Sequence, residues 1–233
     1  MEKKDEIARN PMRGVEGVGG LERTRRAPTT EELQRMLAAA GASTAIYGQL
    51  QTIIRIAAHL GLRRGELCAL RWGDIAFDAM TVTVARAATQ PSREVYFKGP
   101  KSKAGLRTIA ILEPTAALLR DQRARVAAWR LAAGREWADN DLVFSDPLGQ
   151  VLNLEQLSRA AGHVRDEAGV PVAVLPLHGQ RHFALTALHK AGVDILTMQN
   201  RAGHGDVRST QGYITVDLDK DREAAVKASA SLL

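Results

Sequence analysis

The sequence predicts an α+β domain that is mainly α-helical and carries one small antiparallel sheet of three strands. Apolar residues recur at helical spacing over the first third of the chain and again after Pro114. The stretch between them holds short runs rich in β-branched residues, separated by glycine and proline. The chain has 233 residues, 45% of them hydrophobic and 25% charged, which is enough to build a buried core.

The helices expected before the sheet have recognisable ends. Thr29 or Thr30 can cap a first helix, because acidic residues follow in its first turn. A second helix is expected over 43–59 and ends before Gly61, and a third is expected over about 64–71. These segments form the first helical layer of the predicted domain.

The strands and the remaining helices follow in order. Three strands are expected at 80–84, 95–97 and 107–111, and a basic turn of about 98–105 separates the last two. Further helices are expected over 115–132, 154–168, 180–191, 194–202, 207–214 and 218–230.

Composition excludes several classes of protein. A single cysteine, Cys68, excludes an internal disulfide and a cysteine-based metal cluster. No run of 18 apolar residues occurs, so no membrane contact is expected, and the charged start MEKKDEIARN does not resemble a signal peptide. We therefore expect a cytoplasmic protein. Residues 1–27 are rich in glycine and mixed charge and are expected to form a linker.

The net charge is compatible with a nucleic-acid partner. Lysine and arginine number 32 against 26 acidic residues, a balance of +6. A positive balance of this size permits DNA binding but does not by itself indicate it.

Four short motifs carry candidate chemistry. Arg63 and Glu66 lie three residues apart after a helix break, so the carboxylate can orient the guanidinium toward an anion, although the two can equally form an ordinary surface ion pair. His178 and Arg181 have the same spacing on a later helix, and Gly203–His204 and Tyr213 follow. No cofactor or metal is expected, because the histidines lack the neighbouring glutamate of a zinc motif.

The order of these motifs resembles that of the tyrosine recombinase (phage integrase) family over residues 28–233. The resemblance implies the catalytic-core fold of that family, without the helical DNA-clamping domain that usually precedes it. Two neighbours depart from the family's pattern: Gly179–Gln180 stand where Asp-Leu is common, and Ala202 where Leu is common. The residues that match the family's catalytic positions are Arg63, Lys101, His178, Arg181, His204 and Tyr213, with Glu66 and His182 in supporting places. Lys98 and Lys103 lie in the same turn as Lys101 and remain alternatives for the lysine.

The reaction implied by this resemblance is site-specific recombination of double-stranded DNA through a 3′-phosphotyrosine at Tyr213. A tyrosine has a pKa near 10, so it needs a base, and the resemblance assigns that role to His178. Arg63, Arg181 and His204 would stabilise the phosphate oxygens, and Lys101 would protonate the leaving oxygen.

Two alternatives share these residues: a type IB topoisomerase, which reseals the same strand, and a non-catalytic DNA-binding relative. The family resemblance also implies a homo-oligomer on DNA, expected to be a tetramer. In such an assembly the segment 217–233 is expected to pack against a neighbouring protomer.

Overall fold

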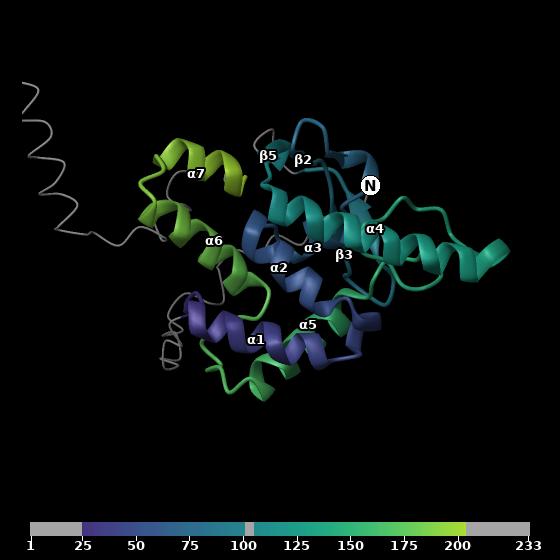
Figure 1. Ribbon diagram of the computed structural model, residues 1–233, viewed down its shortest axis with the longest axis horizontal. Helices are drawn as coiled ribbons and strands as arrows, with labels where there is room; N and C mark the ends of the chain where they lie inside the picture. Colours follow the sequence, from purple (N-terminus) through teal and green to yellow (C-terminus); the bar gives the residue numbers. More distant parts are fainter. Residues whose placement is uncertain (1–24, 101–104, 204–233) are drawn as a thin grey trace, which may run out of the picture.

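The computed structural model describes residues 25–100 and 105–203 (Figure 1). Within these ranges the helices are α1 (Thr30–Ala42), α2 (Leu50–Leu60), α3 (Arg64–Cys68), α4 (Glu113–Ala133), α5 (Leu154–Glu167), α6 (His178–Lys190) and α7 (Ile195–Ala202). The strands are β1 (Ile75–Ala76), β2 (Thr81–Val84), β3 (Ala87–Thr89), β4 (Tyr96–Lys98) and β5 (Arg107–Ala110). The described helices include none that is long and apolar enough to cross a membrane.

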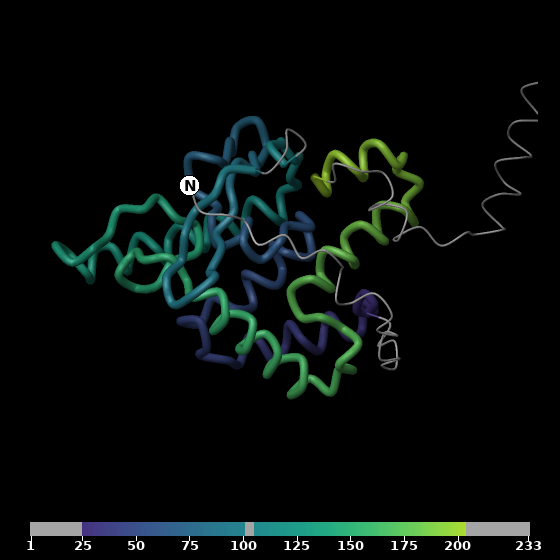
Figure 2. The backbone as a smooth tube through the Cα atoms, turned by 180° about the vertical axis from the view of Figure 1, so that it is seen from behind, coloured from purple at the N-terminus to yellow at the C-terminus, as the bar shows by residue number. Residues whose placement is uncertain are grey.

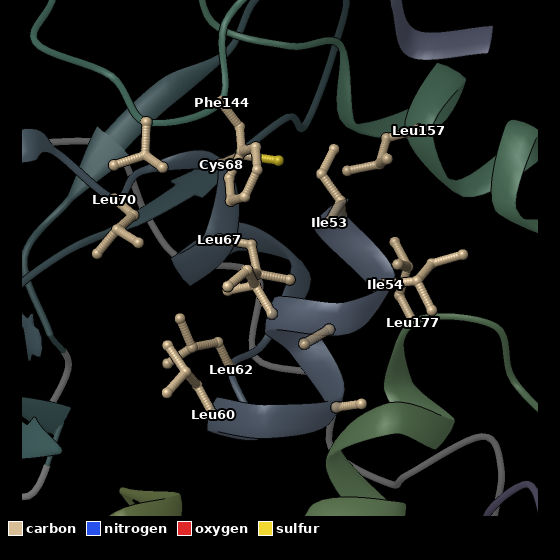
Figure 3. Packing of buried hydrophobic residues seen from close by; sticks show 14 of the residues in the cluster. Ile53, Ile54, Leu60, Leu62, Leu67, Cys68, Leu70, Phe144, Leu157 and Leu177 are labelled. Carbon is tan, nitrogen blue, oxygen red and sulfur yellow. The ribbon is translucent and has the colours of Figure 1, made fainter. Parts of the chain in front are cut away.

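Helix α2 is the centre of the core. It is buried along most of its length and packs against α1, α4, α5 and α6. Ile53, Ile54 and Leu60 are fully buried, and Figure 3 shows them facing side chains from α3, α5 and the loop before α6. Burying side chains of this size contributes roughly 1.5–3 kcal/mol each relative to leaving them in water. This packing fixes the end of α2, from which the candidate site begins.

The capping expected at the first helix is confirmed. The Thr29 hydroxyl accepts a hydrogen bond from the Glu32 backbone N–H at 3.2 Å, and the Glu32 carboxylate accepts one from the Thr29 N–H at 2.8 Å. This reciprocal capping box satisfies two N–H groups that the helix leaves unpaired. Arg26 binds both oxygens of the same carboxylate at 2.6 Å, which ties the preceding chain to α1.

The sheet differs from the predicted one in which strands it contains. A three-stranded antiparallel sheet is present with the order β1-β2-β5, and Val82 pairs with Ile75 on one side and Ile109 on the other. The expected strand at 95–97 does not join it, because β4 pairs with β3 in a separate two-stranded sheet. All residues of β4 are exposed, so no apolar alternation specified its partner. The fold class, mainly helical with small antiparallel sheets, is confirmed.

Two predicted helices have different bounds. The one expected over 43–59 is interrupted by a 3₁₀ turn, in which Ile46 and Tyr47 have φ values of 51° and 57°. Non-glycine residues rarely adopt this left-handed backbone, and nothing in the sequence periodicity signals it. Helix α3 ends earlier than predicted, because the Leu70 carbonyl accepts a hydrogen bond of 2.9 Å from the backbone of Val143.

Helices α6 and α7 lie on one side of the domain, away from the free end of α4 (Figures 1 and 2). Leu185, Met198 and Ala202 form a small apolar cluster of their own between these two helices. Helix α6 also packs on α2, and α7 contacts β5. The end of α7 is thereby placed beside the start of α3. The helices predicted at 207–214 and 218–230, and the segment 217–233, lie outside the described residues.

Candidate active site

Arg63 stands at the junction of α2 and α3, as the sequence predicts. Gly61 ends α2 with a φ of 65°, a left-handed conformation that glycine adopts without strain. Leu62 is buried, and Arg63 has extended backbone (φ −70°, ψ 153°) immediately before α3 begins. The extended backbone directs the Arg63 side chain away from the core, and 44% of that side chain stays exposed.

Gly65 allows α3 to approach β3 closely. A Cβ atom at this position would lie 2.3 Å from the carbonyl oxygen of Ala88, a distance that no side chain tolerates. The glycine between Arg63 and Glu66 therefore serves the packing that sets these two residues at the edge of the β3-β4 sheet.

Glu66 binds two arginines at once. Its carboxylate accepts from the Arg63 guanidinium at 2.9 Å and from the Arg63 backbone N–H at 2.8 Å. It also accepts two hydrogen bonds from Arg107, at 3.1 and 2.9 Å. Burial would raise the pKa of Glu66, but the hydrogen bonds and charges of Arg107 and then Arg63 outweigh it and lower that pKa. Glu66 is therefore ionised at neutral pH.

A cavity of about 490 Å³ opens beside this cluster. It is lined by residues of α3, β2, β3 and β4, by both flanks of the basic turn, and by Gly203. Arg63, Arg86 and Lys98 bring three cationic groups to its described wall. Arg63 is paired with Glu66, the described acid of this wall, and Arg86 is paired with Asp74. The cavity is therefore suited to an anionic ligand.

Arg181 comes from α6 and approaches the same place from the interior. It is 1% exposed and donates to the carbonyls of Gly61 at 2.8 Å and Ala202 at 2.5 Å. Arg63 donates to the same Ala202 carbonyl at 3.5 Å and to that of Gly203 at 3.3 Å. The two guanidinium groups thus converge on the carboxyl end of α7, where the helix dipole is negative.

His178 begins α6 beside these arginines. Its ring lies 4.9 Å from that of His182, centroid to centroid, in an edge-to-face arrangement. Partial burial and the charges of Arg181, Arg63 and Arg25 lower the pKa of His178. Burial, His178 and Arg181 lower the pKa of His182 to about 4. Both imidazoles are therefore neutral near pH 7, and neutral His178 can accept a proton.

The structure brings three of the predicted residues together by hydrogen bonds, namely Arg63, Glu66 and Arg181. His178 begins the helix that carries Arg181 and lines a separate cavity with Arg64. His182 packs edge-to-face against His178, and Lys98, the alternative lysine on β4, lines the cavity of Arg63. Lys101, Lys103, His204 and Tyr213 lie outside the described residues.

Arg107 is a residue of this cluster that the motif analysis missed. Its side chain is completely buried, although it lies on a strand and carries a charge. The alternation of β5 held the signal, because Arg107 shares a strand face with buried Ile109. An arginine in phase with core residues requires an acidic partner nearby, and Glu66 is that partner.

The described ranges contain no cluster of three or more histidine, cysteine, aspartate or glutamate side chains arranged to hold a metal ion. Cys68 is buried, and burial raises the pKa of its thiol to about 12. A protonated, inaccessible thiol is neither a nucleophile nor a metal ligand.

The fold corresponds to a known class, that of the catalytic domains of tyrosine recombinases. The solved Tn1549 transposon integrase in complex with transposon right end DNA superposes with a TM-score of 0.75, at 20% identity over 97% of this chain and 73% of that one. The XerH site-specific recombinase bound to its difH substrate gives a TM-score of 0.64, at 21% identity over 88% of this chain and 55% of that one.

A sequence model of the phage integrase family matches residues 28–220, and the chain belongs to that family. A XerC-like tyrosine recombinase of Caldanaerobacter subterraneus subsp. tengcongensis is 28% identical over 192 residues, covering 77% of this chain and 48% of that protein. A putative prophage phiRv2 integrase of Mycobacterium tuberculosis is 28% identical over 230 residues, covering 97% of this chain and 56% of that protein. The chain therefore spans about half of the length of these two relatives.

Proposed function

We propose that residues 28–233 form the catalytic domain of a site-specific DNA recombinase. One observation carries the proposal: Arg63, at the start of α3, and Arg181, in α6, donate to a single carbonyl oxygen. Neutral His178 begins the helix that carries Arg181. A non-bridging phosphate oxygen is also a hydrogen-bond acceptor and shares the negative charge of the phosphodiester, so it would bind the two guanidinium groups more strongly than the Ala202 carbonyl does. Family membership supports a DNA phosphodiester as the source of that phosphate.

The proposed reaction is a transesterification. The Tyr213 oxygen attacks the phosphorus and forms a P–O bond, while the bond between phosphorus and the 5′-oxygen breaks. The phenolic proton passes to His178, and the departing 5′-oxygen receives a proton from Lys101. The ester energy is kept in the 3′-phosphotyrosine, so a 5′-hydroxyl of a second duplex can reverse the step without ATP.

The arginines supply the electrostatic part of catalysis. Negative charge gathers on the non-bridging oxygens in the transition state, and planar guanidinium forks can bind two oxygens at once. His204 would add one hydrogen bond to the same oxygens. The pairing of Arg63 with Glu66 supports this role, because it holds the fork in a fixed direction at the cavity wall.

The two other tyrosines are poor alternatives to Tyr213. Tyr96 donates its hydroxyl to Glu94 at 2.5 Å, and this hydrogen bond raises the pKa of the phenol. Tyr47 packs edge-to-face on Trp129, with ring centroids 6.3 Å apart, and does not line the cavity of Arg63. The environment of Tyr96 therefore disfavours a nucleophilic phenolate.

Lys101 is the proposed general acid, with Lys98 and Lys103 as alternatives. Lys98 lines the cavity, which makes its substitution a necessary comparison. The three alanine variants should be compared on DNA that carries a 5′-bridging sulfur at the cleavage site. A thiolate leaves without protonation, so this substrate should restore activity only to the variant that lacks the general acid.

The proposed partner is double-stranded DNA, bound by a homo-oligomer expected to be a tetramer. The net charge of +6 and the cationic groups at the cavity support the DNA partner. The names of the matched relatives are those of recombinases and integrases, which supports strand exchange over the resealing of a type IB topoisomerase. Relaxation of a supercoiled plasmid without strand exchange between paired sites would favour the topoisomerase.

Covalent capture from a mixed pool of DNA sequences tests the proposal for any target site. Each duplex in the pool has a randomised centre and a nick close to it. Cleavage releases the short fragment that carries the 5′-hydroxyl, so the reverse reaction cannot occur and the covalent intermediate accumulates. We expect protein-linked DNA after denaturation, enriched in one sequence over successive rounds. Binding without any covalent product at any round would identify a non-catalytic DNA-binding protein instead.

A further inference from the structure

Arg107 is a buried arginine whose hydrogen bonds connect three parts of the site. It donates to both carboxylate oxygens of Glu66, to the carbonyl of Arg201 at 2.8 Å and to that of Gly105 at 3.3 Å. None of its side chain is exposed to solvent. A buried charge persists only when it is paired and hydrogen-bonded, so this network holds the guanidinium in one orientation.

The Glu66 carboxylate is the link between Arg107 and Arg63. Its Oε1 atom accepts from the Nη1 atoms of both arginines, at 3.1 Å from Arg107 and 2.9 Å from Arg63. Its Oε2 atom accepts from Arg107 Nη2 and from the Arg63 backbone N–H. The orientation of the carboxylate that Arg107 fixes is therefore the one that both the side chain and the backbone of Arg63 bind.

The two arginines have unequal surroundings. The Arg107 side chain is fully buried, whereas 44% of the Arg63 side chain is exposed and competes with water for its acceptors. Without Arg107, Glu66 would remain buried with only this half-exposed partner. The carboxylate would then reorient or take up a proton, and Arg63 would lose its fixed acceptor.

We propose that Arg107 is a positioning residue for strand transfer, which orients the Arg63 guanidinium at the cavity by fixing the Glu66 carboxylate. The inference rests on the proposed function. The Arg107 guanidinium is buried and donates to both oxygens of Glu66 and to two backbone carbonyls, so it acts through Glu66 rather than on the phosphate.

A double-mutant cycle tests this coupling. The rate of covalent capture at saturating DNA is measured for the wild type, Arg107→Met, Glu66→Gln and the combined variant, each corrected for its folded fraction. Arg107→Met should lower the rate at least about tenfold, because small misplacements of a catalytic group are costly. In the Glu66→Gln background the same change should cost less than about threefold, because the coupled group is already lost. The DNA dissociation constant should change less than about threefold throughout, because most phosphate contacts remain.

Two control variants separate positioning from stability and from charge. Leu157→Ala opens a cavity in the buried face of α5 and lowers stability without touching the cluster. Arg130→Met removes an arginine that pairs with Asp139 on the surface. Both should keep the wild-type rate per folded molecule. If Arg107→Met does not fold, Arg107→Lys replaces it, since it keeps the charge but not the two-oxygen fork.

Three results would overturn the inference. The first is an unchanged rate per folded molecule in Arg107→Met. The second is full additivity of the rate losses in the double-mutant cycle. The third is a rate loss per folded molecule in Arg107→Met that is no larger than the loss in Leu157→Ala. The Nε–Hε nuclear magnetic resonance signal of Arg63 gives a second measurement that needs no turnover. It should move in Arg107→Met and stay in Arg130→Met, and an unmoved signal would reject positioning even if the wild type captured no DNA. Absence of capture in the wild type would reject the proposed function alone.

Discussion

Arg63 and Arg181 have the same role in the proposed reaction, but different kinds of structure hold them. Arg63 is half-exposed at the start of α3, and the shortest hydrogen bond of its guanidinium goes to an ionised carboxylate, with longer ones to the Ala202 and Gly203 carbonyls. Arg181 is buried in α6 and is oriented by two backbone carbonyls, those of Gly61 and Ala202. The first position depends on a charged partner, and the second on how α2 and α7 are packed.

This difference determines what disturbs each arginine. A carboxylate loses its charge when it is protonated or when its own partner is removed, so Arg63 is sensitive to pH and to Arg107. Backbone carbonyls do not titrate, so these two hydrogen bonds of Arg181 are sensitive to movements of the segments that carry the carbonyls. Variants at the two sites should therefore fail in different ways.

The largest effect is expected from Arg181→Lys. Its fork binds two carbonyls in the interior, so a lysine would leave one of them unpaired and lower the free energy of unfolding by about 1–3 kcal/mol. Covalent capture should also fall at least about 100-fold, because a point charge cannot replace the fork on the phosphate. Chemical denaturation and capture kinetics measure the two losses. If Arg181→Lys were as stable as the wild type, the proposed difference between Arg181 and Arg63 would be wrong.

Arg63→Lys should lose activity without losing stability. The half-exposed ion pair with Glu66 contributes at most about 1 kcal/mol to folding. Capture should nevertheless fall about 10- to 100-fold, because the phosphate contact needs the planar fork. A variant that cleaves at the wild-type rate would show that Arg63 is only a surface residue.

Glu66→Gln should destabilise the protein in a pH-dependent way. The pKa of Glu66 is lower in the folded chain than its ordinary value of 4.5, so the charged form stabilises the fold above that value. This contribution is lost as the pH falls through the folded pKa. Glu66→Gln should therefore be about 2 kcal/mol less stable near pH 7 and closer to the wild type near pH 4. Denaturation at the two pH values measures the difference, and a gap that does not narrow would reject the ionised pair.

The smallest effect concerns the proposed base. The pKa of His178 lies below its ordinary value of 6.5, because of partial burial and neighbouring arginines. The imidazole stays neutral, and able to accept a proton, until the pH falls through that lowered value. The capture rate should therefore stay level down to about pH 6.5 and decline below it. A decline that begins well above pH 6.5 would show that the protonation of another group limits the capture rate.

The sequence predicts the parts of the molecule that depend on local pattern. Helical spacing placed α5 and α6 within two residues at each end, and the break at Gly61 placed Arg63 at the start of α3. The prediction that 95–97 joins the three-stranded sheet was wrong. Strand β4 has no buried face to specify its partner, and it pairs with β3 instead. The left-handed turn at Ile46 was also not predicted, since residues other than glycine rarely adopt this backbone and hydrophobic periodicity carries no signal of it.

The long-range part of the site could not be predicted from spacing. Glu66 and Arg107 are 41 positions apart, and nothing in either motif says that they meet. The convergence of Arg63 and Arg181 on Ala202 likewise depends on α7 returning to the start of α3. Such contacts follow from how the helices pack, which the pattern of one sequence does not determine.

The central claim is that Tyr213 is the residue that becomes bonded to DNA. Mass spectrometry of the captured adduct after proteolysis tests it directly, because the chain has only 3 tyrosines. We expect the nucleotide on the peptide that contains Tyr213, and no adduct from Tyr213→Phe, with DNA affinity within about threefold of the wild type. A nucleotide on Tyr47 or Tyr96, or a capture rate for Tyr213→Phe equal to that of the wild type, would contradict the account.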